Sequence, residues 1–521
     1  MEFGAVSFDC RVLINGLEAG GHTGMWSPFQ VDISLFVQPG KNQIELVVWK
    51  CGRRFPPRES LAGFLPDVAT TFGGIWQSVR LFWFEAAVAD LRCLARPGNV
   101  LSVMGGVVGS DATEPIEILV EVSDASGRVL LSTRDVAMGS GNDFDMQLDT
   151  SGQPRWSAAT PSLHTVTITA WQGSRAIARA RRVMGWRDVA ISAGQAQIDG
   201  RPLHLRGVLD WGWQPEIIRP APDRASVLRQ FEQARVLGFN LVKLCLFAPD
   251  EATFQAADEA GMYLWLEMPL WLPHLTPAAR AQAAYEYGLI FRRLSHHPSI
   301  VVLSLGCELN AEADAEFLRS LADEARHYFP NTLLCDNSGS AEAYGGVGTA
   351  LSDFYDYHFY TDPHFFAGLV DHFDRPYRPA RPWLFGEFCD ADTGRDFSAL
   401  QPEPWWLHEP VALDRDDFLS TRDYRQRLLA AGVADGGQTL TRIARKQATA
   451  VRKFILEQAR LHDATGGYVI SGWSDTPITT SGIVDDQGEL KFDPAEWQRF
   501  NADAVLLLER ERRRRDRKSV V

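Results

Sequence analysis

The sequence Ser295-His-His-Pro-Ser-Ile-Val-Val-Leu-Ser-Leu-Gly-Cys-Glu-Leu-Asn310 contains the element around which the chain is organised. An uninterrupted apolar run, residues 300–305, follows a proline and ends at Gly306, and Glu308 comes two positions later. A run that is apolar on both faces is typical of a buried parallel strand, and in α/β barrels the C-terminal ends of such strands carry the catalytic groups. The stretch therefore predicts a barrel strand that delivers a carboxylate. The alternative is that Glu308 caps the next helix or pairs with an arginine.

On both sides of this run, strand patterns alternate with amphipathic helix patterns. Helices are predicted at residues 223–237 and 250–260, each followed by glycine. Eight strands are expected, at residues 203–209, 240–247, 262–268, 300–305, 332–335, 354–359, 382–385 and 467–472. Eight such units close a (β/α)8 TIM barrel. A doubly wound open sheet is the alternative, but no Gly-x-Gly-x-x-Gly turn follows the first strand.

Before this alternation the sequence has the pattern of antiparallel β-structure. Residues 1–86 contain short alternating stretches that are separated by turn signals such as Asn15-Gly16. Residues 87–185 repeat the pattern over about a hundred residues, the size of an immunoglobulin-like sandwich. Two β modules therefore precede the barrel. The segment 512–521, at the end of an Arg-rich run, is predicted to be a solvated, charged tail.

Composition excludes several classes of function. The net charge of −14 argues against a general nucleic-acid binder, since phosphate contact needs a basic surface. The seven cysteines are odd in number and never in Cys-x-x-Cys spacing, which predicts neither a disulfide framework nor a zinc site and favours a cytoplasmic, reducing location. No run of about 18 apolar residues predicts a membrane span. The sequence calls for no cofactor or metal, and it leaves open whether the chain forms a homo-oligomer.

A second carboxylate stands at a comparable place, 79 positions after the first. Glu387 follows the apolar strand pattern of residues 382–385 and Gly386. Glycoside hydrolysis needs such a pair: one carboxyl group protonates the leaving oxygen and one attacks the anomeric carbon, about 5 to 5.5 Å apart when configuration is retained. The sequence therefore predicts that Glu308 and Glu387 form a catalytic pair.

The chain resembles glycoside hydrolase family 2, the group of β-galactosidases, β-glucuronidases and β-mannosidases, over essentially its full length. Six stretches carry the resemblance in the correct order: Phe72-Gly-Gly-Ile-Trp-Gln-Ser-Val79, Trp156-Ser-Ala-Ala-Thr-Pro-Ser-Leu-His164, Leu205-Arg-Gly-Val208, His297-Pro-Ser-Ile300, Glu308 and Glu387-Phe388. The resemblance implies a multidomain chain with an N-terminal jelly-roll β-sandwich at 1–86, an immunoglobulin-like sandwich at 87–185 and a C-terminal TIM barrel at 186–511.

The resemblance also implies the roles of individual residues. Glu308 is expected to be the general acid/base and Glu387 the nucleophile of a retaining β-glycosidase, and Tyr360 is expected to steady the nucleophile, with His358 beside it. Further substrate-binding candidates at strand ends are Asp210, Trp211, Trp213, Lys243, Trp473 and Asp475, and Glu267 is expected to be a supporting carboxylate. For His358 and Tyr360 the alternative role is packing, and for the others it is packing or surface pairing. The partner is expected to be a carbohydrate, a β-glycoside whose sugar the sequence does not identify.

Two features depart from the family's pattern. Cys307 stands where the family has an asparagine that contacts the sugar 2-hydroxyl, and a thiol is a weak donor and a weak acceptor. The jelly roll also begins late, at Phe3, so its first strands are expected to be missing. A strand edge is then expected to be exposed. Whether an export signal precedes these strands stays an open question. These departures motivate the alternative of a non-hydrolytic carbohydrate-binding pseudoenzyme on the same scaffold.

The segment from Cys389 to Gly436 is long for one barrel connection and rich in tryptophan, proline and acidic residues. Long connections in compact domains are commonly lids or binding loops. Because this segment leaves the barrel on the face expected to carry the active site, we predict a substrate-facing loop. The alternative is a surface insertion.

Overall fold

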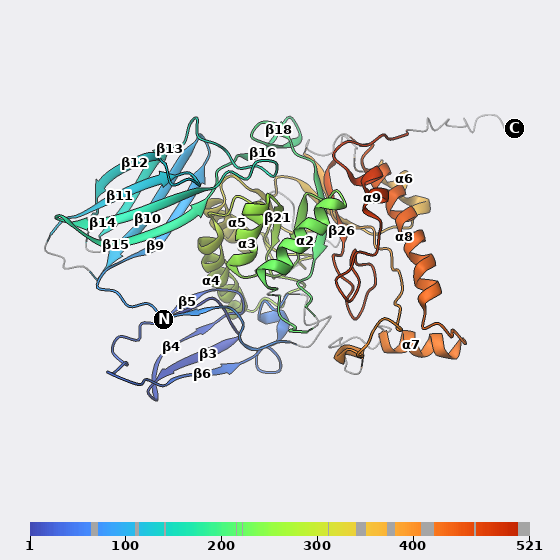
Figure 1. The fold of residues 1–521 in the computed structure, drawn as a ribbon, viewed down its shortest axis with the longest axis horizontal. Helices are drawn as coiled ribbons and strands as arrows, with labels where there is room; N and C mark the ends of the chain where they lie inside the picture. Colours follow the sequence, from blue (N-terminus) through green and yellow to red (C-terminus); the bar gives the residue numbers. More distant parts are fainter. Residues whose placement is uncertain are drawn as a thin grey trace.

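The computed structural model describes the chain apart from residues 64–70, 110–113, 140–141, 215, 221, 311, 340–350, 372, 374–380, 408–420, 463–464 and 509–521. Two β-rich regions lie on one side of a central region of strands and helices, and the C-terminal helices cover its other side (Figure 1). The predicted charged tail, 512–521, lies outside the described residues. In the part of the chain that the structure describes, no helix combines the length and the apolar character that a membrane crossing requires.

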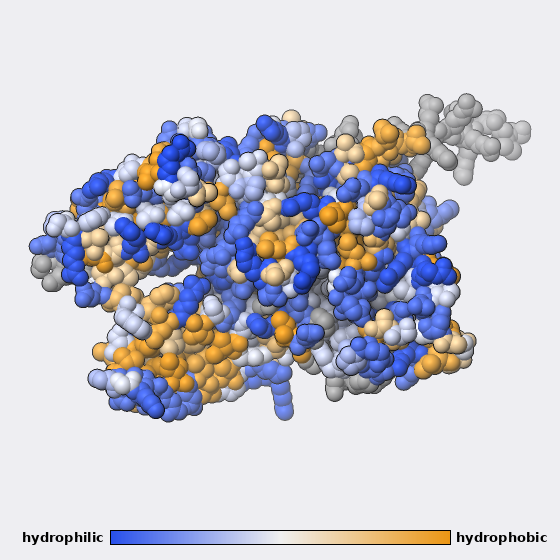
Figure 2. Space-filling model, viewed as in Figure 1, coloured by the Kyte–Doolittle hydropathy of each residue, from blue (hydrophilic) through white to orange (hydrophobic). Residues whose placement is uncertain are grey.

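The first β-rich region consists of small antiparallel sheets with the strand orders β5-β1-β8, β2-β7 and β4-β3-β6. The strands are β1 (Glu2–Phe3), β2 (Val6–Ser7), β3 (Asp9–Ile14), β4 (Leu17–Thr23), β5 (Phe29–Gln30), β6 (Ile44–Trp49), β7 (Gly74–Ile75) and β8 (Val79–Arg80), and a short 3-10 helix, η1, spans Pro57–Glu59. Exposed apolar side chains include Ile44 and Val47 of β6 and the run Leu81–Phe84. Figure 2 shows apolar surface gathered over this region. Part of this sandwich is therefore not covered by other elements of the described chain.

Buried polar groups attach both β-rich regions to the barrel. The carboxylate of Glu286, which is completely buried in a barrel helix, accepts hydrogen bonds from the backbone N–H groups of Met25 (2.9 Å) and Trp26 (3.2 Å). The guanidinium of Arg187, just after the second region, donates to the backbone carbonyls of Pro298 (2.7 Å), Ile300 and Asn331. Buried charged groups persist where they are hydrogen-bonded, so these contacts fix how the modules dock.

The second β-rich region is an antiparallel sandwich. One sheet has the order β13-β10-β9 and the other β12-β11-β14-β15. The strands are β9 (Ala87–Arg96), β10 (Val100–Val108), β11 (Ile116–Ser123), β12 (Val129–Val136), β13 (Asp143–Asp149), β14 (His164–Gln172) and β15 (Arg175–Met184). Alternate residues of β11 and β13 are buried, because successive side chains of a strand point to opposite faces and only one face of each sheet meets the core. A small sheet of β16 (Val189–Ser192), β17 (Gln195–Ile198) and β18 (Arg201–Pro202) leads into the barrel.

The central region is an eight-stranded parallel sheet with the order β23-β22-β21-β20-β19-β26-β25-β24. Its strands are β19 (Leu205–Asp210), β20 (Leu241–Leu244), β21 (Tyr263–Glu267), β22 (Ile300–Ser304), β23 (Leu333–Cys335), β24 (Tyr355–Phe359), β25 (Trp383–Phe388) and β26 (Thr465–Ser471). The last strand pairs with the first, Leu205 opposite Gly467, whereas β23 and β24 are not paired in the described residues, so the barrel is nearly closed. The predicted TIM barrel is confirmed and the open-sheet alternative is wrong. Residues 340–350, between β23 and β24, lie outside the described part.

The barrel helices begin and end where capping residues stand. Asp223 caps α2 (Arg224–Val236) by accepting from the N–H of Ser226, and Asp250 caps α3 (Glu251–Ala260) in the same way. Gly261 ends α3 in the left-handed conformation, which glycine adopts without strain. The other helices are α4 (Pro277–Leu294), α5 (Ala315–Tyr328), α6 (Pro363–Val370), α7 (Thr421–Ala430), α8 (Gln438–Ala459) and α9 (Pro494–Asn501). Both helix predictions are confirmed to within one residue at each end.

The segment 389–436 contains regular structure in its described parts, the 3-10 helix η3 (Trp405–Leu407) and α7. Trp406 and Leu407 are buried, and the ring of Trp405 lies 6.2 Å from the ring of Trp213, which follows β19. The segment therefore lies at the C-terminal ends of the barrel strands. Residues 408–420 of this segment lie outside the described residues.

Candidate active site

Glu308 lies just beyond the C-terminal end of β22, with its backbone held between the ends of the two neighbouring strands. Its N–H donates to the carbonyl of Ser338 (2.9 Å), and the N–H of Cys307 donates to the carbonyl of Leu270 (2.9 Å). Its φ is +46°, a left-handed conformation that is uncommon for a residue other than glycine. Because such strain persists only where surrounding contacts enforce it, this conformation marks Glu308 as a functional candidate.

The carboxylate of Glu308 is about a quarter exposed and has two hydrogen-bond partners. Oε1 lies 2.9 Å from Nδ1 of His358, and Oε2 accepts from the indole N–H of Trp271 at 3.1 Å. Burial raises the pKa of this carboxyl group, but the hydrogen bond and positive charge of His358 outweigh it and lower the pKa to about 2. Glu308 is therefore ionised in this arrangement.

Glu387 lies on β25, which pairs with β26, and its side chain is 12% exposed. The strand runs to Phe388, so Glu387 lies within it. The predicted strand ended earlier, at residue 385, with Glu387 after it. The hydroxyl of Tyr360 donates to Oε2 at 2.9 Å. A Cβ on Gly386 would lie 2.3 Å from Oδ1 of Asp356, so the residue before this carboxylate has no room for a side chain.

Four further groups surround the other oxygen of Glu387, Oε1. They are Nζ of Lys243 (3.4 Å), Nε2 of His358 (3.6 Å), Sγ of Cys307 (3.8 Å) and Sγ of Cys245 (3.9 Å). One ammonium, one imidazole and two weak thiol donors thus converge on a single carboxylate oxygen. Burial raises the pKa of both thiols well above the usual value, so both are neutral.

Lys243, from β20, is completely buried between two carboxylates. Its Nζ lies 2.8 Å from Glu267 and 3.4 Å from Glu387, and it also donates to the hydroxyl of Ser338 at 3.0 Å. Burial opposes its charge, but the carboxylates outweigh burial and raise the pKa of Lys243 well above its usual value. A buried ammonium with two anionic partners supplies positive charge directly beneath Glu387.

His358 contacts both predicted catalytic carboxylates at once. Nδ1 faces Glu308, Nε2 faces Glu387, and Nε2 also lies 3.2 Å from the hydroxyl of Ser338. Burial acts to lower the pKa of this imidazole, but the charge of Glu387 and the hydrogen bond with Glu308 outweigh it and raise the pKa. The imidazolium therefore neutralises part of the negative charge of the pair.

The structure thus brings together Lys243, Glu267, Cys307, Glu308, His358, Tyr360 and Glu387, all from predicted strand ends. The other candidates lie near these ends but have different contacts. Asp210 is buried and accepts from the N–H of Gly212 (2.8 Å) and from Gln230 (2.9 Å), so it stabilises the turn after β19. The aromatic candidates gather at the same end of the barrel: Trp213 contacts Trp405, and Trp211 and Trp473 flank Gly472.

Asp475 is engaged in a buried ion pair. Its Oδ1 lies 2.7 Å from Nζ of Lys491 and accepts from the N–H of Gly482 at 3.0 Å. Burial raises the pKa of Asp475 to about 6 and lowers the pKa of Lys491 to about 8. Neither Glu308 nor Glu387 is among the polar partners seen for Asp475 in the described chain, so its contacts give it a structural part.

Three residues of the site were missed by the sequence reasoning: Cys245, Trp271 and Ser338. Trp271 and Ser338 follow predicted strands by three positions, whereas Cys245 lies within the predicted strand 240–247, because the observed strand β20 ends at Leu244. Considering every polar or aromatic residue just after each predicted strand would have found Trp271 and Ser338, since all strand ends of a barrel meet at one face.

No protein-family model matches the chain, but curated proteins and solved structures are similar to it. A putative β-glucuronidase of Formosa agariphila is 24% identical over 350 residues, which cover 63% of this chain and 41% of the relative. A β-galactosidase of Photobacterium profundum is 25% identical over 331 residues, 57% of this chain and 31% of the relative. The chain therefore matches less than half of the length of these curated relatives.

Solved structures share the fold over nearly the whole chain. A β-glucuronidase of Bacteroides uniformis, covalently bound to cyclophellitol-6-carboxylate aziridine, superposes with a TM-score of 0.74 at 16% identity, covering 96% of this chain and 61% of the other. A putative β-galactosidase of Bacteroides fragilis gives a TM-score of 0.75 at 15% identity, covering 97% and 75%. Sequence relatives and shared fold together support the resemblance to glycoside hydrolase family 2 that the sequence shows.

Proposed function

We propose that the protein is a retaining β-glycosidase in which Glu387 is the nucleophile and Glu308 the general acid/base. The single observation that carries this proposal is the pair of carboxylates at the C-terminal ends of β22 and β25, linked by the imidazole of His358. Two carboxylates that face a common space at this end of a barrel are the groups that retaining glycoside hydrolysis requires.

The surroundings of Glu387 suit a nucleophile. Lys243 and Tyr360 each donate to one of its oxygens, so the direction of the carboxylate is fixed. The hydroxyl of Tyr360 is itself placed by Ser471, 2.7 Å away. A carboxylate that is held in this way loses little conformational freedom when it attacks the anomeric carbon.

The surroundings of Glu308 suit an acid whose proton is stored next to it. The 2.9 Å contact between Nδ1 of His358 and Oε1 of Glu308 is a path along which the proton of the imidazolium passes to the carboxylate. A bound glycoside covers the exposed side of Glu308 and removes water, which favours the neutral carboxylic acid. His358 is therefore proposed as a positioning residue that supplies the proton for the first step.

The reaction then proceeds in two displacements. In the first, an oxygen of Glu387 bonds to the anomeric carbon, the glycosidic bond breaks, and the proton of Glu308 goes to the leaving oxygen. In the second, Glu308 takes a proton from water, the water oxygen bonds to the anomeric carbon, and the ester bond to Glu387 breaks. Glu387 is then ionised again, and Glu308 returns its proton to His358, which restores the initial state.

The substrate is proposed to be a terminal β-glycoside, bound among the aromatic side chains at the barrel mouth. Trp211 and Trp405 of the segment 389–436 are half-buried at this end, whereas Trp213 and Trp473 are buried. Half-buried aromatic surfaces suit the apolar faces of sugar rings. Glucuronide and galactoside are the first sugars to test, because the named relatives act on them.

The decisive experiment compares matched glutamate-to-glutamine variants on a panel of aryl β-glycosides that includes glucuronide, galactoside, mannoside, glucoside and arabinoside. Glu308→Gln is expected to lower kcat/KM by about 10²- to 10⁴-fold, the usual share of general acid/base catalysis, and Glu387→Gln by more. The control is Glu316→Gln on the exposed first turn of α5, which should retain wild-type turnover. Wild-type rates in either active-site variant would refute the assignment.

Covalent trapping separates hydrolysis from the pseudoenzyme alternative. A 2-deoxy-2-fluoro glycoside of the preferred sugar should label Glu387, as seen by mass spectrometry of the digested protein, whereas a non-hydrolytic sugar-binding protein would bind sugars and turn over none. The relatives, which are named as hydrolases, lend that alternative no support. The domain limits 1–86, 87–185 and 186–511, the cytoplasmic location and the oligomeric state stay predictions.

A further inference from the structure

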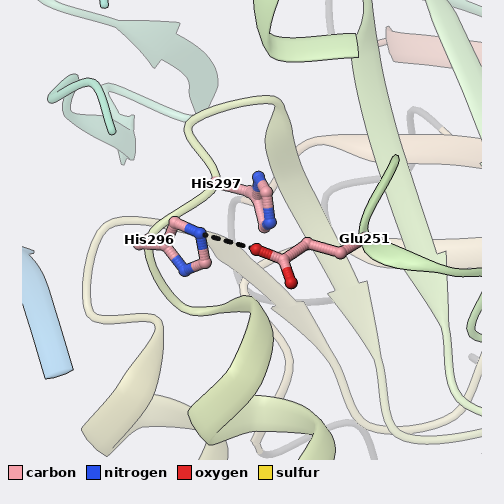
Figure 3. Close-up of side chains that lie close together, drawn as sticks. All are labelled: Glu251, His296 and His297. Atoms are coloured by element: carbon pink, nitrogen blue, oxygen red, sulfur yellow. Dashed lines mark ion pairs between the residues drawn. The ribbon is translucent and has the colours of Figure 1, made fainter. Parts of the chain in front are cut away.

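Three side chains that could hold a metal ion lie together where α3 meets the connection that leads into β22. His296 and His297 stand in the connection between α4 and β22, before that strand begins, and Glu251 is the first residue of α3. One nitrogen of each imidazole and one oxygen of Glu251 lie within 4.8 Å of one another. Figure 3 shows the three side chains directed toward a common point from these two elements.

His297 has the hydrogen bonding of a metal ligand. Its Nδ1 lies 2.6 Å from Oδ2 of Asp258, a carboxylate that is 97% buried and also accepts from the N–H of Ser299. Its other nitrogen, Nε2, is buried and has no hydrogen-bond partner among the described residues. Histidines that bind metals almost always donate their second N–H to a carboxylate or carbonyl, which leaves the other nitrogen's lone pair for the ion.

His296 offers a second nitrogen to the same space. Its ring is 4.0 Å from the ring of His297, and its Nε2 lies 3.8 Å from Oε1 of Glu251. Both histidines are at least 95% buried. Either ring nitrogen of an imidazole is a common metal ligand.

Glu251 supplies a carboxylate that is loosely held. Its polar contacts are long: 3.5 Å to Gln255, 3.7 Å to Arg182 of β15 and 3.8 Å to His296. Its side chain is 21% exposed, so an ion reaches it from solvent. Donors around a tetrahedral zinc ion lie about 3.3 Å apart, given Zn–N and Zn–O bonds of about 2.0 to 2.1 Å. A rotation of the Glu251 side chain is the movement that brings the three donors to that spacing.

We propose that Glu251, His296 and His297 form a binding site for a divalent transition metal, with Zn²⁺ as the ion whose ligand preferences they match. Two imidazoles and one carboxylate are a common zinc donor set, and water completes the tetrahedron at the exposed side. The ion links α3 to the start of β22. His296 and His297 precede β22, at the N-terminal face of the barrel, where side chains contribute to stability and not to the catalytic chemistry.

Arg182 competes with the ion for Oε1 of Glu251. The two positive charges repel each other at short range, and the guanidinium has to move aside when the ion binds. Removing this charge while retaining polarity, as in Arg182→Gln, is therefore expected to strengthen metal binding. A gain in metal affinity in Arg182→Gln is an internal control, because general damage to the fold would weaken metal binding in every variant.

The test is a titration of the chelator-treated full-length protein with Zn²⁺ by calorimetry and with Co²⁺ by visible absorption. One ion per chain is expected. Glu251→Gln and His296→Asn should each weaken binding at least tenfold, and His327→Asn, at an exposed position of α5, should bind as the wild type does. Glu251→Gln is the safer variant for folding, because its side chain is partly exposed.

Several outcomes would overturn the proposal. These are equal affinity in wild type and Glu251→Gln, no binding of Zn²⁺ or Co²⁺, or a sulfur-to-cobalt charge-transfer band, which would place the ion at Cys245 and Cys307 in the active site. A rise of the unfolding temperature with Zn²⁺ in wild type that is absent in Glu251→Gln supports it further. Because the cluster is far along the strands from Glu308 and Glu387, its failure would leave the proposed glycosidase activity untouched.

Discussion

The Nδ1 atom of His358 lies 2.9 Å from Oε1 of Glu308, and the same ring presents Nε2 to Glu387 at 3.6 Å. One imidazole therefore reports on the protonation of both carboxylates. The pair and the histidine titrate as a coupled unit, so the apparent pKa values of the pH–rate profile belong to the unit and not to one residue.

Replacing His358 with asparagine is expected to move the alkaline limb of kcat/KM to lower pH. In the wild type the raised pKa of His358 keeps a proton beside Glu308 at and above pH 6.5, and activity falls as pH rises through that pKa. Without the imidazole only Glu308 itself can hold the proton, so kcat/KM begins to fall at a lower pH. The measurement is kcat/KM from pH 4 to 9, with His364→Asn on the exposed start of α6 as the matched control. An unchanged alkaline limb in His358→Asn would argue that His358 only packs.

Ionisation of Glu308 is expected to contribute stability that is lost in acid. Its folded pKa of about 2 lies below the ordinary glutamate value of about 4.3, so the folded state binds fewer protons in this range than the unfolded chain. The contribution is present above about pH 4.3 and disappears as pH falls toward 2. Urea unfolding at pH 7 and pH 3 should show a smaller loss of stability between these pH values in Glu308→Gln than in the wild type. Equal losses would contradict the charge interaction with His358.

Restoring asparagine at position 307 tests what the thiol changes. Sγ of Cys307 contacts Glu387 at 3.8 Å, and a thiol donates only weakly. Cys307→Asn adds an amide at the place where the family's asparagine contacts the sugar 2-hydroxyl, so kcat/KM for an ordinary glycoside is expected to rise at least tenfold. For the 2-deoxy analogue, which lacks that hydroxyl, kcat/KM should rise much less in Cys307→Asn. Equal gains on both substrates would mean that the amide acts without touching the sugar.

Removing the charge of Lys243 is expected to destabilise the barrel strongly. Lys243→Met leaves Glu267 and Glu387 buried without their shared cation, and breaking a buried pair from one side typically costs about 3 to 5 kcal/mol. The double variant Lys243→Met with Glu267→Gln removes one of the stranded charges and should recover part of the loss. The free energy of unfolding from urea titration measures both. A Lys243→Met protein as stable as the wild type would show that the buried ammonium is dispensable.

Much of the fold follows from local patterns. The apolar run 300–305 and its counterparts, the aspartate caps and the glycine stops fix where strands and helices lie, and closure of eight such units brings Glu308 and Glu387 to one face although 79 positions separate them. The helix α7 was not predicted, because its residues carry mostly polar side chains and lack a clear apolar stripe.

The detail of the site was less accessible from sequence, because it depends on which side chains meet in space. Position along a strand predicted that Lys243 and His358 belong to the site, but not that both contact the same oxygen of Glu387. Asp475 follows a strand just as Glu308 does, yet it is buried against Lys491, 16 positions later, through a turn that no periodic pattern announces. A polar residue just after a strand can therefore be placed at the C-terminal end of the barrel from sequence, but the side chain that it contacts cannot be predicted in this way.

The pairing of β19 with β26 joins residues that are synthesised far apart in time. Leu205 lies opposite Gly467, so the first barrel strand has no neighbour on that side until more than 250 further residues have left the ribosome. The two β-rich regions complete their own sheets long before that. Since domains generally fold in order from the N-terminus during synthesis, the nascent barrel passes through a stage with an open edge, when the chain depends most on chaperones and is most prone to aggregation.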